Sequence, residues 1–338
     1  MRKFLNTIIL IFAITLTAGC TSHEEWHKEQ GVVWNTTFNI IYENDVNLLD
    51  SIYACFAEID RSLSIFTPGS TVNRVNEWSS TNDSIPTIQV DEDFAVVFSK
   101  SQDVALLSGG LFDPTVGPLV ELWGFGRDKS VEAPDSSSVE EILLSVGIGE
   151  CKLISVNTEN GTAYNLYKKT PETRFNFSAI AKGYGCDKVA AMLRRNGVCN
   201  YLVEIGGEIN VSGISHRGKD WIVQIDAPVP AEESGSMHIE LMQLSVTDCG
   251  IATSGNYRNY RNDESGHRYG HTINPLTGYP VQTDVLSATV IVLTTMEADA
   301  LATACMAMTS QEAKAFLESI DGVRGVIVTV DSILKIGI

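Results

Sequence analysis

Hydrophobic and polar positions follow two periods along the chain, and these periods divide it into strands and helices. Alternation with a period of two predicts strands at residues 32–42, 221–227, 238–246 and 285–293. Apolar residues three and four apart predict helices at residues 47–63, 91–108, 139–146, 178–196 and 310–319. Hairpin patterns follow at 201–213 and 325–338, and no internal repeat is found. Short strands with neighbouring helices and hairpins favour an α+β fold over a doubly wound sheet.

One more helix is predicted in the segment TTMEADALATACMAM, residues 294–308. Thr294 and Glu297 have the spacing of a capping box, which marks the start of a helix. Asp299 and Thr303 are four residues apart and therefore lie on one helical face. They either complement the helix dipole and bond to the preceding turn, or supply two oxygens to a hard cation such as Mg²⁺. The residues alone leave both interpretations open.

Glycine pairs interrupt two predicted elements. Gly183 and Gly185 lie in the first turns of the helix at 178–196, where each costs about 1 kcal/mol relative to alanine. Either a bound phosphate or close packing of another backbone would explain them, and the neighbouring Lys182 is then either a ligand contact or a surface charge. Gly206 and Gly207 separate two strands and form either a simple hairpin turn or part of a site.

Three polar segments are further candidates for chemistry. Residues 250–255, GIATSG, could offer amides and hydroxyls to phosphate, although they match no known phosphate-binding loop. His271 precedes the turn-rich sequence TINPLTG and is the best candidate for a general base. The apolar segment at 111–129 contains two prolines and three glycines, and it is expected to be a covered loop. No nucleophilic triad and no zinc-spaced set of Cys and His is found in the sequence.

The first thirty residues have the pattern of an exported lipoprotein. Arg2 and Lys3 precede an apolar run at 4–16, which is shorter than the ~20 residues that a membrane-spanning helix needs. The small residues before Cys20 fit a lipoprotein cleavage site. The expected organisation is therefore a signal peptide, a polar tether that begins at the lipidated Cys20, and one globular domain, at 1–19, 20–30 and 31–338.

Charge and cysteine content narrow the classes of function. Without residues 1–19 the basic residues fall from 24 to 22 against 42 acidic residues, so the net charge is −20. Such a chain is a poor ligand for nucleic acid, and a phosphorylated ligand is expected to arrive with a metal ion. The six cysteines after Cys20 form no C-x-x-C motif, so buried free thiols are expected, although an exported protein could pair some of them.

Several of these segments, taken in order, resemble the ApbE family of FAD:protein FMN transferases. The similar segments are FDPTVGPLVELWGFG, FSAIAKGYGCD, EIGGEI, IATSGNYRNY, HTINPLTGYPV and EADALATA, and they span nearly the whole mature chain. The resemblance implies an α+β fold with a duplicated T-fold-like arrangement and a cleft for FAD between the halves. It also implies a Mg²⁺-dependent transfer of FMN from FAD to a threonine of an acceptor protein, with release of AMP, on the periplasmic side of the membrane.

The resemblance further implies the roles of individual residues. Asp299, Thr303 and the backbone carbonyl of Ala179 would bind Mg²⁺, and His271 would help remove the proton of the acceptor threonine. Flavin contacts are expected from Phe112, Asp113, Asn176, Lys182 and Gly207. Acceptors in the family include subunits of sodium-pumping NADH:quinone oxidoreductase and Rnf-type complexes.

Three places depart from the family pattern. Asn176 and Asn274 stand where Asp is common, and the segment WNTTF stands where M-G-T is frequent, so the contact expected near Trp34 and Asn35 differs. Two other functions use the same residues. A FAD pyrophosphatase would give FMN and AMP at the same metal site, and a non-enzymatic lipoprotein would only bind FAD.

Overall fold

The computed structural model describes residues 25–79, 87–125, 134–159, 161–229, 239–255, 260–262 and 268–338. The predicted signal peptide and the lipidation site Cys20 lie outside the described residues. Within the described residues no helix is long and apolar enough to cross a membrane. The six described cysteines are free, and all of them except Cys199 are buried.

The largest element is an eight-stranded antiparallel sheet with the order β1-β2-β6-β7-β10-β13-β14-β15. Alternation of burial along β2, where Phe38, Ile40 and Tyr42 are buried, reflects the two faces of the sheet. The strands are β1 (Glu25–Val33), β2 (Thr36–Asn44), β6 (Tyr201–Ile205), β7 (Glu208–Ser212), β10 (Cys249–Gly255), β13 (Val285–Val292), β14 (Arg324–Thr329) and β15 (Ile333–Ile336).

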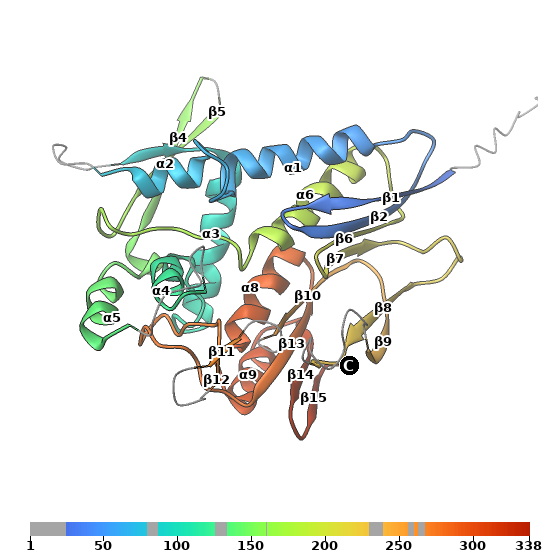
Figure 1. Ribbon diagram of the computed structural model, residues 1–338. Coiled ribbons are helices and arrows are strands. Elements are labelled where there is room, and N and C mark those ends of the chain that lie inside the picture. Colours follow the sequence, from blue (N-terminus) through green and yellow to red (C-terminus); the bar gives the residue numbers. More distant parts are fainter. Residues whose placement is uncertain are drawn as a thin grey trace, which may run out of the picture.

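Different elements pack on the two faces of this sheet (Figure 1). Helices pack on one face, where Val189 and Leu193 belong to one apolar cluster with Ile40 and Val203. A hairpin of β8 (Trp221–Asp226) and β9 (Glu240–Val246) packs on the other face. The covering helices are α1 (Leu49–Leu63), α6 (Ala181–Arg195), α8 (Thr295–Cys305) and α9 (Ser310–Glu318).

A second group of elements packs around α3 (Glu92–Leu107), which lies against α1 and α8 (Figure 1). Its centre is a group of four phenylalanine rings with centroids 5.2 to 6.2 Å apart, Phe94, Phe98, Phe175 and Phe177. The remaining described elements are α2 (Thr71–Glu77), β3 (Ile88–Val90), η1 (Pro114–Val116), α4 (Gly117–Leu122), α5 (Ser136–Leu143), η2 (Ile148–Glu150), β4 (Lys152–Thr158), β5 (Gly161–Tyr167), β11 (Tyr260–Asn262) and β12 (Arg268–Gly270).

The predicted α+β class is confirmed, and three local predictions are wrong. The strand expected at 32–42 is a hairpin, because Trp34 and Asn35 adopt φ of 50° and 60° and reverse the chain between β1 and β2. The last six residues expected in the tether, 25–30, therefore belong to the sheet. The segment at 111–129 is not all loop, because η1 and α4 form within it.

The segment at 250–255 is also not a phosphate-binding loop. It lies in β10 between β7 and β13, so most of its backbone amides take part in sheet pairing. The helix predicted from Thr294 is α8, and the side chain of Thr294 accepts a hydrogen bond from the amide of Glu297 at 3.4 Å. This helix carries the residues from which the site is built.

Candidate active site

Asp299 and Thr303 lie on one face of α8, as the helical period requires. Asp299 is only 3% exposed, and its Oδ2 accepts a hydrogen bond of 3.0 Å from the backbone amide of Gly183 on α6. Burial raises the pKa of Asp299, while Lys182 and the Gly183 amide act in the opposite direction. The hydroxyl of Thr303 lies 3.2 Å from that of Ser254 on β10. The helix thus presents a fixed carboxylate and a fixed hydroxyl.

The glycine at position 183 allows α6 and α8 to approach closely. A Cβ atom there would lie 2.8 Å from both Asp299 Cβ and Met296 Cα, and closer still to the carbonyl oxygen of Thr295. Packing of another backbone is therefore the explanation for Gly183. Gly185 has a comparable reason, because a Cβ there would meet the ring of Trp34 at 2.7 Å.

Asp187 anchors the first turn of α8 from α6. Its carboxylate accepts hydrogen bonds of 2.9 Å from the amides of Thr295 and Met296, and Asn210 donates another at 2.8 Å. Burial raises the pKa of Asp187, while these hydrogen bonds lower it. A carboxylate at a helix N-terminus also complements the helix dipole. Asp187 was not predicted from the sequence, although its spacing of four from Gly183 places both on one face of α6.

Most of the predicted site residues line one cavity of about 570 Å³. Its wall combines α8, the start of α6, the loop before η1, the end of β10 and the loop at 271–275. The predicted residues in this wall are Phe112, Asp113, Asn176, Ala179, Lys182, His271, Asp299 and Thr303. Gly207 is not among the lining residues, and its neighbour Gly206 takes that place.

Asp113 shapes the cavity wall through bonds within its own loop. Oδ1 accepts hydrogen bonds from the amide and hydroxyl of Thr115 at 2.8 and 2.6 Å, and Oδ2 accepts one from the amide of Ile148 at 2.9 Å. Burial raises the pKa of Asp113 above its ordinary value despite these bonds. Both oxygens hold protein groups, so Asp113 maintains the loop that carries Phe112.

Asn176 forms a local turn shortly before the start of α6. Its Oδ1 accepts hydrogen bonds from the backbone amide and the hydroxyl of Ser178 at 3.0 and 2.6 Å. The backbone amide of Asn176 donates to the carbonyl of Pro114 at 2.8 Å. The side-chain oxygen therefore acts as the acceptor of an Asx turn. An aspartate would make the same bonds, so the departure from the family pattern leaves this turn intact.

Lys182 forms an ion pair with Glu208, a residue that the sequence reasoning missed. Glu208 is 3% exposed and follows the Gly206–Gly207 turn at the start of β7. Burial raises the pKa of Glu208 above its ordinary value, the ammonium group of Lys182 lowers it, and the carboxyl group of Asp299 raises it. Burial would lower the pKa of Lys182, but the carboxylates of Asp299 and Glu208 raise it above its ordinary value. The ammonium group is therefore kept charged beside two acidic groups.

His271 enters the cavity on a loop with an internal framework. Asn274 Oδ1 accepts a hydrogen bond of 2.8 Å from the amide of Leu276, and its backbone carbonyl accepts one of 2.8 Å from Gly278. The indole of Trp123 donates to the carbonyl of Gly278 at 2.8 Å, and the rings of His271 and Phe125 lie edge to face with centroids 6.3 Å apart. These contacts hold the loop that carries the imidazole.

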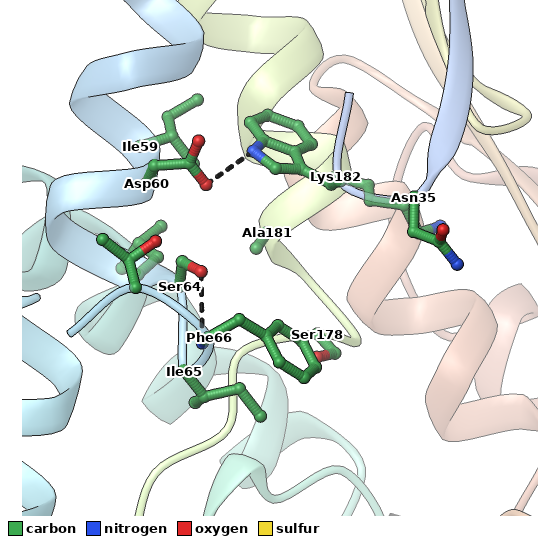
Figure 2. Close-up of a pocket in the computed structure, with 12 residues that line it drawn as sticks. Asn35, Ile59, Asp60, Ser64, Ile65, Phe66, Ser178, Ala181 and Lys182 are labelled. Atoms are coloured by element: carbon green, nitrogen blue, oxygen red, sulfur yellow. Dashed lines mark hydrogen bonds between the residues drawn. The ribbon is translucent and has the colours of Figure 1, made fainter. Parts of the chain in front are cut away.

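A second cavity of about 680 Å³ shares lining residues with the first. Figure 2 shows the residues that line this second cavity. Ser178 and Lys182 line both cavities, so the two meet at the start of α6. The wall is largely apolar and includes Trp34, Ile59, Leu63, Ile65 and Phe66. The indole of Trp34 donates a hydrogen bond of 2.9 Å to Asp60, whose pKa burial raises. The position where the chain departs from the M-G-T pattern thus forms part of this wall.

The donor set of the first cavity suits a hard cation. No cluster of three or more His, Cys, Asp or Glu able to hold a metal is found in the described part of the chain. Asp299 and Thr303 supply oxygen atoms, and Ala179 lies in the same wall. Mg²⁺ binds oxygen ligands, commonly one or two carboxylates with water and substrate phosphates completing its shell. These residues therefore fit Mg²⁺, whereas a zinc site would need a different set.

Comparison with known proteins gives consistent matches over nearly the whole chain. The model of the ApbE family matches residues 32–327. A FAD:protein FMN transferase of Haemophilus influenzae is 33% identical over 311 residues, covering 90% of this chain and 86% of that protein. One of Vibrio cholerae is 34% identical over 321 residues, covering 93% and 91%.

Solved structures give the same picture of the fold. The flavin transferase ApbE from Vibrio cholerae superposes with a TM-score of 0.76 at 31% identity, covering 92% of this chain and 96% of that one. The apo form of the flavinyl transferase ApbE from Pseudomonas stutzeri gives 0.78 at 25% identity, covering 93% and 95%. The α+β arrangement is therefore that of these flavin transferases.

Proposed function

The chain belongs to the ApbE family of transferases, and we propose that it is a Mg²⁺-dependent FAD:protein FMN transferase. In the proposed reaction a threonine hydroxyl of an acceptor protein attacks the FMN phosphorus of FAD. A new oxygen–phosphorus bond forms, the phosphoanhydride bond breaks, and AMP leaves. The observation that carries this proposal is the single cavity that combines Asp299, Thr303, Lys182 and His271.

Asp299 and Thr303 are proposed to hold the cation, together with the carbonyl of Ala179. Among the described residues, the backbone amide of Gly183 donates a hydrogen bond to Oδ2 of Asp299. Oδ1 is left for a ligand. The chemistry that Mg²⁺ supplies when bound is positive charge beside a breaking phosphoanhydride. Residues with small side chains, such as Ala179 and Gly255, line the same cavity and leave room for phosphates.

Lys182 and His271 are proposed to act on the two sides of the reacting phosphate. The ammonium group of Lys182, which Glu208 holds in place, would contact phosphate oxygens as a point charge. The imidazole of His271 would accept the proton of the acceptor hydroxyl as a general base. The predicted assignment of Phe112 to a ligand contact is compatible with its place in the cavity wall.

The second cavity is proposed to receive the flavin ring. Its wall of Trp34, Ile65 and Phe66 is apolar and aromatic, which suits a flat ring system. Phe66 is 72% exposed on the protein alone, so a bound ring would cover part of its surface. The junction at Lys182 would then lie between the ring and the phosphates.

The proposals for the acceptor and for the location of the protein rest on the family resemblance. We propose a flavoprotein subunit as acceptor, of the kind found in sodium-pumping NADH:quinone oxidoreductase or Rnf-type complexes. We also propose that the chain is anchored through a lipid at Cys20 on the periplasmic side of a membrane. Since β1 begins at Glu25, only a short segment would separate the lipid from the domain.

Mass spectrometry of an acceptor after incubation with the chain, FAD and Mg²⁺ tests the proposal. A mass gain equal to one FMN on a threonine, with equimolar AMP, is the expected result. Release of FMN and AMP without modification of the acceptor would instead identify a FAD pyrophosphatase. Recovery of intact FAD from a chain that binds it would identify a binding protein without enzymatic activity.

A further inference from the structure

One buried oxygen in the site has no partner. Among the described residues, three buried side-chain oxygens lack a hydrogen-bond partner, those of Ser101, Ser287 and Glu208 Oε2. Of these three residues, Glu208 lines the first cavity, which is called the catalytic cavity below; the second cavity is called the aromatic cavity. A buried acceptor without a donor costs roughly 1–3 kcal/mol, and more for a charged group, so such an atom commonly indicates a missing ligand group.

The position of Glu208 relates it to the junction of the two cavities. Its Oε1 pairs with the ammonium group of Lys182, and Lys182 lines both cavities. Gly206, two residues earlier, lies against the same lysine, since a Cβ atom there would be 3.4 Å from Lys182 Cδ. Glu208 therefore lies where the catalytic cavity meets the aromatic cavity, and Oε2 is its carboxyl oxygen without a partner.

The chemistry of a carboxylate limits what can pair with it. Phosphate groups in the same cavity would repel it, whereas a hydroxyl group can donate a hydrogen bond to it. FAD carries hydroxyl groups on the ribityl chain, which joins the ring to the phosphates, and on the ribose of its AMP half, which lies on the other side of the phosphates from the ring. If the ring occupies the aromatic cavity and the phosphates lie beside Asp299, the ribityl chain has to cross the junction.

We propose that Oε2 of Glu208 accepts a hydrogen bond from a hydroxyl group of the ribityl chain of the flavin substrate. The inference rests on the proposed function, and it makes Glu208 a specificity-determining residue. Glu208 selects a linear sugar alcohol at the junction and at the same time holds Lys182 toward the phosphates. A dinucleotide whose ring is joined through a closed ribose presents its hydroxyl groups differently and lacks this contact.

Binding of two flavins without phosphate tests the inference separately from catalysis and from metal. Riboflavin and lumiflavin share the ring, and only riboflavin has the ribityl chain. In the unmodified chain riboflavin should bind more tightly than lumiflavin. Glu208→Ala should lower the affinity for riboflavin roughly ten-fold or more and leave the affinity for lumiflavin unchanged. Glu240→Ala, at an exposed position of β9, is a matched acidic control and should change neither affinity.

A third ligand covers the case in which Glu208→Ala does not fold. A flavin with a hydroxyl-free alkyl chain of the same length should bind the unmodified chain more weakly than riboflavin, by a similar factor. Equal affinity for these two flavins, or an equal loss of riboflavin and lumiflavin in Glu208→Ala, would overturn the inference. Weaker Mn²⁺ binding by Glu208→Ala without flavin would also overturn it, since the oxygen would then serve a cation. Failure of the unmodified chain to bind any flavin would refute the proposed function itself.

Discussion

The backbone amide of Gly183 donates a hydrogen bond of 3.0 Å to Oδ2 of Asp299, so α6 orients the carboxylate that α8 carries. This bond forms because the two helices approach more closely at Gly183 than a side chain would permit. The orientation of the proposed metal ligand therefore depends on helix packing as well as on its own rotamer.

Gly183→Ala should destabilise the fold, although alanine favours helices over glycine by about 1 kcal/mol. The added methyl group would press on Thr295 and Asp299, and overpacking of this kind costs about 1–3 kcal/mol. Chemical denaturation measures the change in the free energy of unfolding. Gly149→Ala is the control, because a Cβ there meets nothing within 4 Å. Equal or higher stability of Gly183→Ala would contradict the packing argument.

Asp187→Asn should loosen the N-terminus of α8. An amide has one acceptor oxygen, so at least one of the bonds to the amides of Thr295 and Met296 is lost, at a cost of about 1–3 kcal/mol. Hydrogen exchange should show faster exchange of the Thr295 and Met296 amides, and thermal unfolding should occur at a lower temperature. Asp331→Asn, at an exposed position, should change neither. Unchanged protection of the two amides would show that Asp187 does not anchor the helix.

How much of the site the sequence reveals depends on the range of the interactions. The pairing of Asp299 with Thr303 follows from the helical period alone. Asp187 and Glu208 were missed because their partners are distant in the chain: Thr295 is 108 residues from Asp187, and Lys182 belongs to a different element from Glu208. Contacts between residues so far apart in the chain cannot be predicted from a local sequence pattern.

The local errors have equally specific causes. The turn between β1 and β2 contains Trp34 and Asn35 instead of glycine or proline, so the usual signal of a hairpin is missing. The helix α4 spans six residues, Gly117–Leu122, which is too short for a clear helical period. GIATSG reads as a loop because of its glycines, but both glycines lie in β10, and Gly250 packs against the backbone of Thr294 and Thr295.

His271→Gln should lower the rate of FMN transfer by about 10²–10⁴-fold, the usual range for loss of a general base. The affinity for FAD should change little, because the proposed role is proton transfer and not ligand binding. Single-turnover transfer to an acceptor and a separate FAD titration measure the two quantities. His216→Gln, at an exposed position, should behave like the unmodified chain in both. A large loss of FAD affinity with an unchanged transfer rate would assign His271 to binding.

Lys168 should make stability depend on pH in the alkaline range. Its ammonium group is buried and donates to the carbonyls of Val75, Trp78 and Pro171 at 3.2, 3.0 and 2.8 Å. Burial lowers the pKa of Lys168 to about 8, below the value of ~10.4 of an unfolded lysine. Between these values the unfolded chain binds more protons, so this residue makes the free energy of unfolding rise with pH.

Denaturation of the unmodified chain and of Lys168→Met from pH 7.5 to 10.5 checks this sign. The free energy of unfolding of the unmodified chain, minus that of Lys168→Met, should increase as pH rises across this window. Lys314→Met, on the surface of α9, should show no such difference. Parallel curves for Lys168→Met and the unmodified chain would mean that the pKa of Lys168 is not lowered in the folded state.

The central claim is that Asp299 and Thr303 bind the divalent cation that faces the phosphates of FAD. Anomalous diffraction from crystals soaked with Mn²⁺ and FAD tests this claim most directly, with crystals of Asp299→Ala treated in the same way. The expected result is a manganese peak in contact with Asp299, Thr303 and a phosphate oxygen, and no peak at that position in Asp299→Ala. A flavin nucleotide bound in the cavity with its phosphates away from α8, and no manganese between Asp299 and Thr303, would contradict the account.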